Sequence, residues 1–130
     1  MTRGQAILLA SAAFLAGATL THQRERPWRV YDGQEWQRFT FSEKRAYLAG
    51  FQSGAGLTQA EAVAGGEKSD SGRVAAVLDS LDRAGALRFA HGGNVYAARL
   101  SDFYWWEDHR TIRLYLALRH INQGMRQTEE

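Results

Sequence analysis

Apolar and polar positions divide the chain into three parts. An uncharged, mostly apolar run covers residues 4–21, a polar stretch with the only proline covers 22–35, and amphipathic segments fill 36–126. In these segments apolar residues recur every three or four positions, the spacing of a helix with one buried face. The sequence therefore predicts a mainly α-helical protein: an N-terminal hydrophobic segment (1–21), a linker (22–35) and a small helical domain (36–126).

Three amphipathic helices are predicted in the domain. Thr40 and Glu43 have the spacing of a capping box before the first. Asp70 or Ser71 caps the second, and the third begins near Asp102 and continues to about residue 125. Their apolar faces predict these core residues: Tyr47, Leu48, Phe51, Val74, Leu78, Leu81, Leu116 and Ile121.

Three shorter features complete the expected fold. Residues 58–65 form a separate helical stretch. Gly50 and Gly54 lie one helical turn apart, which suggests a close approach of another backbone. Residues 87–97 leave two alternatives open: a helix, or a short β-hairpin in which apolar positions alternate around a Gly-Gly turn.

The N-terminal run also has two interpretations. Arg3, the apolar stretch and Ala16-Gly17-Ala18 have the layout of a signal peptide cleaved near Ala18. Alternatively, residues 4–21 span a bilayer, which needs about 20 apolar residues and about 17 at the least. The flanking cations and indole suit a membrane interface and favour the anchor. The expected interface residues are Arg24, Arg26 and Trp28.

Composition removes several classes of function. The chain has no cysteine, so disulfides, thiolate metal sites and cysteine nucleophiles are excluded. The formal net charge of +2 is no electrostatic footprint for nucleic acid. No Gly-x-Ser-x-Gly elbow, phosphate loop or Cys-x-x-Cys-His motif occurs. We therefore expect a protein that is not an enzyme and uses no cofactor.

Four consecutive aromatic residues, 103–106, are the most distinctive feature. Helical rotation spreads them around the whole circumference, so at least one tryptophan must lie near the surface. The polar stretch 107–110 beside them resembles the rim of a protein contact, with the tryptophans as its apolar centre. Its Glu-Asp-His triplet points in diverging directions and cannot hold one metal ion. The predicted partner-binding residues are Tyr104, Trp105, Trp106, His109 and Arg110.

Two motifs at the ends of the domain carry a family resemblance. Trp36 precedes a Ser-x-Lys-x-x-Tyr-x-x-Gly-Phe-x-x-Gly helix (42–54), and a Phe-Tyr segment with Arg110 and Ile112 follows near the C-terminus. This pattern resembles a group of small secreted bacterial all-helical proteins of uncharacterised function. The resemblance implies a helical fold and export, and supplies no mechanism.

A second resemblance covers residues 57–100, which look like a winged helix-turn-helix with a wing around residues 91–94. DNA binding needs cations on the reading helix. This helix offers Arg73 and then two acidic residues, Asp79 and Asp82. DNA binding is therefore only a third interpretation.

The leading hypothesis is a membrane-anchored, extracytoplasmic accessory subunit of a larger integral membrane complex, such as a respiratory or photosynthetic one. Its anchor would be residues 4–21 in the inner membrane, with the helical domain facing the periplasm and no nucleic acid as partner. The alternative is a soluble secreted or periplasmic binding or inhibitor-type protein, released by cleavage near Ala18.

Overall fold

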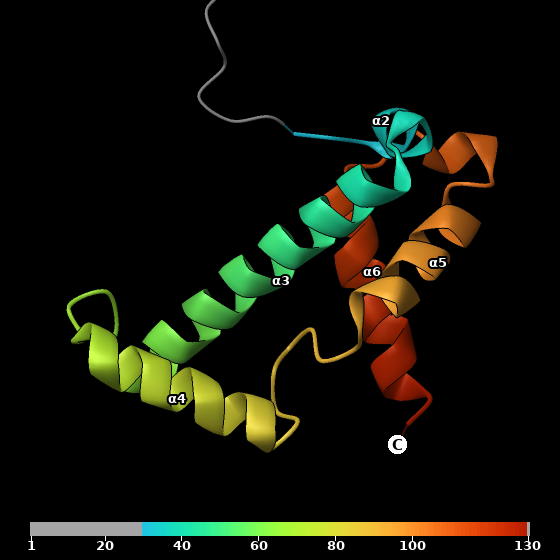
Figure 1. Cartoon of the computed structure of the whole chain (residues 1–130). Coiled ribbons are helices and arrows are strands. Elements are labelled where there is room, and N and C mark those ends of the chain that lie inside the picture. The colour runs from blue at the N-terminus through green and yellow to red at the C-terminus, as the bar shows by residue number, and fades with distance from the viewer. Residues whose placement is uncertain (1–29, 130) are drawn as a thin grey trace, which may run out of the picture.

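The computed structural model describes residues 30–129, which fold as a small assembly of helices (Figure 1). Within that range no strand is present, and a single isolated bridge pairs Asp32 with Arg113. The predicted mainly α-helical class is thus confirmed. The helices are α2 (Gly33–Arg38), α3 (Phe41–Ala64), α4 (Ser71–Arg83), α5 (Gly93–Phe103), the short 3-10 helix η1 (Glu107–His109) and α6 (Leu114–Gln127).

Helix α3 is the spine of the fold. Its first half packs against α5, which pairs with α6, and its second half packs against α4 (Figure 1). Helix α2 lies at the start of α3, and α4 lies at the opposite end. The chain therefore enters the fold at the end that α2, η1 and the start of α6 share.

Local capping fixes the helix starts. Thr40 Oγ1 accepts a hydrogen bond from the Glu43 backbone at 3.2 Å, and the Glu43 carboxylate accepts one from the Thr40 backbone at 2.7 Å. These bonds also lower the pKa of Glu43. Asp70 accepts from two backbone N–H groups at the start of α4. Both predicted caps are confirmed, with Asp70 rather than Ser71 capping the second helix.

Two separate apolar clusters hold the helices together. The second is small and joins the end of α3 to α4 through Ala60, Ala64 and Val74. The main core lies between α2, the first half of α3, α5 and α6. Its buried members are Trp36, Leu48, Tyr96, Leu100, Tyr104, Leu114, Ala117 and Leu118.

Asn122 of α6 forms hydrogen bonds both to α5 and to the loop that precedes it. Tyr96 donates a hydrogen bond to Asn122 Oδ1 at 2.7 Å, and Asn122 Nδ2 donates to the Arg88 carbonyl at 2.8 Å. Burial raises the pKa of Tyr96. Gln52 adds bonds from α3 to the carbonyls of Phe89 and His91 in the same loop. This loop is therefore held from two helices.

Several expected elements differ from the structure. No hairpin forms at 87–97, because residues 87–92 are a loop and the helix α5 begins at Gly93; the wing of the winged-helix resemblance is missing with it. Residues 58–64 continue α3 instead of forming a separate helix. The last helical region is split, with α5 ending at Phe103 and α6 starting at Leu114.

The expected core is mostly correct, with one error. Tyr47, Leu48, Phe51 and Ile121 lie in or against the main core, and Val74 lies in the small one with Leu78 and Leu81 packed against it. Leu116 is 45% exposed because it points away from the face that carries Ala117 and Leu118.

The glycines are also used differently than expected. An added Cβ would meet nothing within 4 Å at Gly50 or Gly54, so no backbone approaches there. Close packing occurs at Gly56, where a Cβ would lie 3.2 Å from Leu78 Cδ1. It is tightest at Gly33, where a Cβ would overlap the ring of Tyr104, with Cε1 only 2.6 Å away.

The folded unit begins before Trp36. Tyr31 packs on the main core, and Asp32 caps α2, so the C-terminal end of the predicted linker 22–35 belongs to the fold. Among residues 30–129 no helix is both long and apolar enough to cross a bilayer. The predicted membrane segment 4–21 and the interface residues Arg24, Arg26 and Trp28 lie outside the described residues.

Candidate functional site

The aromatic run 103–106 forms the turn between α5 and η1. Trp105 is 78% exposed and Trp106 is 63% exposed, whereas Tyr104 is fully buried and Phe103 is half-buried. The prediction that at least one tryptophan lies near the surface is confirmed, and in fact both do. Tyr104, however, cannot contact a partner, because its ring is part of the main core.

Successive backbone hydrogen bonds between residues three or four positions apart determine the path of this turn. The Tyr104 N–H donates to the Leu100 carbonyl at 2.9 Å, which closes α5. Trp106 is extended, with ψ of 129°, and η1 follows as a single 3-10 turn. The Ile112 N–H then donates to the His109 carbonyl at 2.9 Å. Because these bonds are local and successive, the two exposed indoles sit on a defined backbone.

Tyr104 anchors the turn to the rest of the fold. Its hydroxyl donates to the Ile112 carbonyl at 2.8 Å, and its own carbonyl accepts from Gln37 Nε2 of α2 at 3.0 Å. Its ring lies on Gly33, where no side chain would fit. Burial raises the pKa of Tyr104, so it stays protonated and able to donate. The turn is thereby fastened to both α2 and the start of α6.

His109 is held in place rather than free. Its ring stacks on Phe103 at a centroid distance of 4.3 Å, and Nδ1 lies 2.8 Å from the Phe103 carbonyl oxygen. Within the described range no group of three or more His, Asp or Glu side chains is arranged to hold a metal ion. His109 thus stabilises the turn through its contacts with Phe103, and its partly exposed ring lines the same hollow as Trp106.

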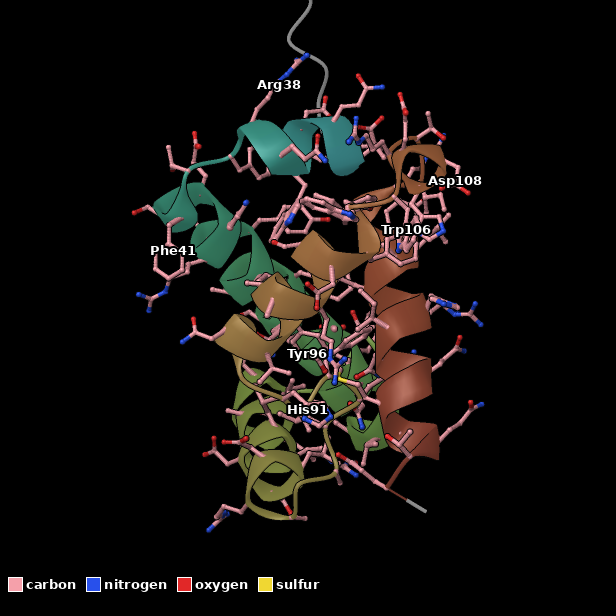
Figure 2. The ribbon with its side chains drawn as sticks, turned by 90° about the vertical axis from the view of Figure 1, so that its right-hand side faces the viewer. Arg38, Phe41, His91, Tyr96, Trp106 and Asp108 are labelled. Atoms are coloured by element: carbon pink, nitrogen blue, oxygen red, sulfur yellow. The ribbon has the colours of Figure 1, made fainter. Side chains whose placement is uncertain are left out.

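Two hollows flank the turn. The α5–α6 hollow, of about 430 Å³, has aromatic and apolar lining residues such as Phe103, Trp106 and Met125, together with Arg99 and Asp102. The α2–η1 hollow, of about 500 Å³, is polar and is lined by Gln34, Gln37, Arg38, Glu107, Arg110 and Thr111. Figure 2 shows Arg38, Trp106 and Asp108 at the end of the molecule where α2 lies. Trp106 thus lines the first hollow, and Glu107 and Arg110, which follow it in the chain, line the second.

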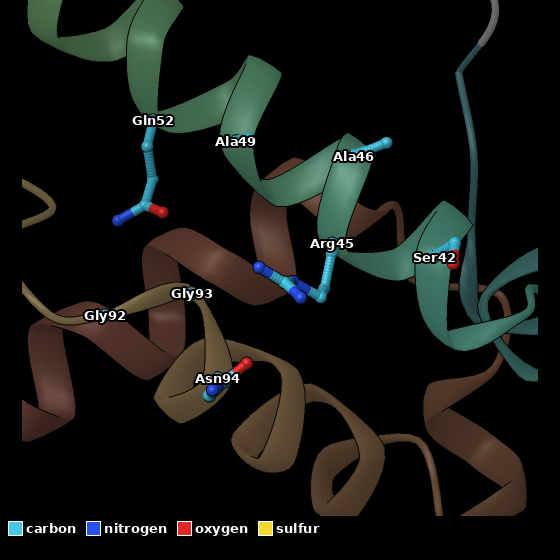
Figure 3. Close-up of a pocket in the computed structure, with 8 residues that line it drawn as sticks. All are labelled: Ser42, Arg45, Ala46, Ala49, Gln52, Gly92, Gly93 and Asn94. Atoms are coloured by element: carbon cyan, nitrogen blue, oxygen red, sulfur yellow. The ribbon is translucent and has the colours of Figure 1, made fainter.

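A hollow of about 590 Å³ lies elsewhere, between α3 and the start of α5 (Figure 3). Arg45 reaches from α3 toward Gly92, Gly93 and Asn94, and Gln52 borders it on the far side. The Gln52 amide is already bonded to loop carbonyls, and Ala46, Ala49, Gly92 and Gly93 contribute no functional side chain to the wall. This hollow carries no set of side chains suited to acid–base or nucleophilic chemistry.

Of the predicted site residues, Trp105, Trp106, His109 and Arg110 lie on the short segment 105–110, which comprises the turn after α5, η1 and its C-cap; this segment is called the tryptophan turn below. Tyr104 is buried in the core instead. Sequence reasoning missed the polar face of α2, formed by Gln34, Gln37 and Arg38. The only local signal was their helical spacing opposite buried Trp36, which marks a solvated face and does not reveal a neighbour 70 residues away.

Comparison with known proteins adds no further guide. No family model matches the chain, and neither the curated proteins nor the solved structures contain a significant match. The function must therefore be argued from the site itself.

Proposed function

We propose that the protein is a non-enzymatic interaction subunit, which binds a protein partner through the turn formed by Trp105, Trp106, His109 and Arg110. The observation that carries this proposal is the pair of adjacent tryptophans, 78% and 63% exposed, on a braced turn. At roughly 250 Å² for each indole side chain, they expose up to about 350 Å² of apolar surface. This total is within the range of about 300–600 Å² found for the largest apolar patch of a typical monomer, which is often functional.

The chemistry of the turn supports a protein contact. Tryptophan and arginine are enriched among the residues that dominate binding energy. Tryptophan buries a large area with only two rotatable side-chain bonds, and arginine offers several hydrogen-bond donors in a fixed planar geometry. Glu107, Asp108, His109 and Arg110 border the indoles and supply a polar rim. Because Tyr104 fixes the backbone, little ordering is required on binding.

The partner is proposed to be a larger integral membrane complex, with residues 4–21 as the anchor and the domain in the periplasm. The chain enters the fold beside the turn: the Leu114 N–H bonds to the Tyr31 carbonyl, and Gly33 packs on Tyr104. Residues 22–29 extend at most about 28 Å. An anchored domain would thus keep the tryptophan turn close to the membrane and to a membrane-embedded partner.

Single alanine variants of the tagged full-length protein test this function. We expect Trp105→Ala and Trp106→Ala to keep the melting temperature within about 3 °C, since both side chains are exposed, and to lose most of the partner that co-purifies from native membranes. Phe41→Ala is the matched control, because Phe41 is 65% exposed on α3 away from the turn. Unchanged association in both tryptophan variants would place the interface elsewhere.

The soluble secreted or periplasmic protein remains the alternative, with the same binding surface. The intact mass of the native protein separates the two: a chain that retains residues 4–21 supports the anchor, and one that starts at Thr19 supports the secreted form.

A further inference from the structure

We propose that the α2–η1 hollow binds the carboxylate of an acidic side chain of the partner. This inference rests on the proposed function and names the chemistry of the partner. The first observation is that polar residues of α2 and of the η1 region line the same hollow. Gln34, Gln37 and Arg38 lie on one side of α2, and Glu107, Arg110 and Thr111 face them across about 500 Å³.

The hollow carries a net positive charge. Arg38 and Arg110 contribute two guanidinium groups, and Glu107 contributes one carboxylate. Among residues 30–129 the single ion pair within 4.0 Å joins His91 to Glu129, so neither arginine is paired with a carboxylate of the described fold. The net excess is one positive charge, which one bound carboxylate neutralises.

Arg110 gives the sharpest evidence. Its side chain is half-buried, and its Nε atom is fully enclosed and has no hydrogen-bond acceptor. No bond through Nε therefore ties this guanidinium to an acceptor of the described fold. A carboxylate in the hollow accepts two hydrogen bonds from the terminal nitrogens of the guanidinium, which form a planar fork.

The neighbours of Arg110 fit this ligand. The Thr111 hydroxyl and the Gln34 carboxamide can donate hydrogen bonds, and Gln37 is fixed by its bond to the Tyr104 carbonyl. The volume lies in the range of ligand-sized clefts and accommodates an Asp or Glu side chain. Because η1 starts directly after Trp106, a partner segment that covers the indoles would place an adjacent acidic residue here.

Arginine side-chain NMR on the full-length protein tests the site, with acetate as the probe. We expect acetate, titrated at constant ionic strength against chloride, to shift the Arg110 Nε–H resonance saturably. Acetamide, its neutral analogue, should give no saturable shift. Glu107→Gln should tighten acetate binding at least threefold by removing the repelling carboxylate. Arg110→Lys should weaken it at least tenfold, since lysine cannot bind two oxygens in the fork geometry.

Arg83→Lys is the matched control, because Arg83 lies on α4 outside the hollow; it should leave acetate binding unchanged. If Arg110→Lys fails to fold, Glu107→Gln and Arg38→Gln still decide: the first must tighten and the second must weaken binding. No saturable shift with acetate, or equal shifts with acetamide, overturns the proposal. Phosphate binding tenfold tighter than acetate would also overturn it, by assigning a phosphate ligand instead.

The outcomes separate this inference from the proposed function. If the tryptophan variants lose the partner while Arg110→Lys changes neither acetate nor partner binding, the contact turn stands and the carboxylate site does not. If acetate binds as described while both tryptophan variants keep the partner, the site stands and the proposed contact turn fails.

Discussion

Replacing Tyr104 by phenylalanine tests whether the tryptophan turn is anchored as described. The ring is fully buried and would stay in place, so the change removes only the hydroxyl that donates to the Ile112 carbonyl at 2.8 Å. Loss of one partner leaves the buried acceptor unsatisfied, which costs about 1–3 kcal/mol. The bond is only partly buried, so we expect a loss of about 1–2 kcal/mol. For a unit of about 100 residues, each kcal/mol lowers Tm by roughly 4–8 °C.

The pH dependence of this variant supplies a second, independent readout. Burial raises the pKa values of Tyr104 and Tyr96 and brings that of Tyr47 to about 12. Below pH 10 each phenol is protonated in both states. Above pH 10 the unfolded chain ionises first, so stability falls as pH rises, by up to about 1.4 kcal/mol per pH unit for each tyrosine. Tyr104→Phe lacks one such group, so its stability should fall less steeply than that of the wild type.

Urea denaturation followed by far-UV circular dichroism between pH 7 and 11 measures both effects. Tyr115→Phe is the control, because the Tyr115 hydroxyl accepts its hydrogen bond from Arg113 at the surface, and its loss should change stability by less than about 0.5 kcal/mol. If Tyr104→Phe matches the wild type at pH 7 and keeps the full alkaline slope, the hydroxyl is not engaged and the anchoring of the turn is refuted.

Five further substitutions test the packing and the capping of the helices. Gly33→Ala should destabilise strongly, because its methyl group would overlap a buried tyrosine ring, whereas Gly50→Ala should stabilise by up to about 1 kcal/mol in open helical surface, as thermal melting of both would show. Leu48→Ala should lower the free energy of unfolding, measured by urea denaturation, by about 2–5 kcal/mol, and Leu116→Ala should lower it by less than about 1 kcal/mol. Similar losses for both variants would mean that the buried face of α6 is wrongly assigned. Thr40→Ala should cost about 1 kcal/mol, and no loss would show that the capping box of α3 is dispensable.

Local signals explain what the sequence predicted correctly. The bonds that cap α3 and α4 join residues two or three positions apart, so Thr40, Glu43 and Asp70 reveal them directly. The apolar faces of α3 and α4 follow from helical spacing in the same way. The exposure of the indoles was also predictable, since four consecutive aromatics exceed what one helical face can bury.

The errors arise where tertiary packing decides between local alternatives. The alternating residues around the Gly-Gly pair suit a hairpin, but Tyr96, Leu100 and Tyr104 recur every four positions and bury one face of α5. No proline or glycine marks the end of α5 at Phe103. A continuous helix over 102–125 would be about 36 Å long. Instead the helix stops at Phe103, where the ring of the next residue, Tyr104, packs against Gly33 of α2. The hollow beside Arg110 depends on residues 70 positions apart, so no local pattern announces it.

The separation of the two apolar clusters along α3 implies that the molecule opens unevenly. The contact between α3 and α4 buries only Ala60, Ala64 and Val74, with Val77, Leu78 and Leu81 partly buried against them. The other end has eight buried residues, among them Trp36, Tyr96 and Tyr104. Local unfolding needs less free energy where less apolar surface is buried, so amide hydrogens in α4 should exchange faster than those in α5 and α6. The loop at 66–69 lies at the other end of the fold from the tryptophan turn (Figure 1), so a fluorophore or tether attached there would leave that turn uncovered.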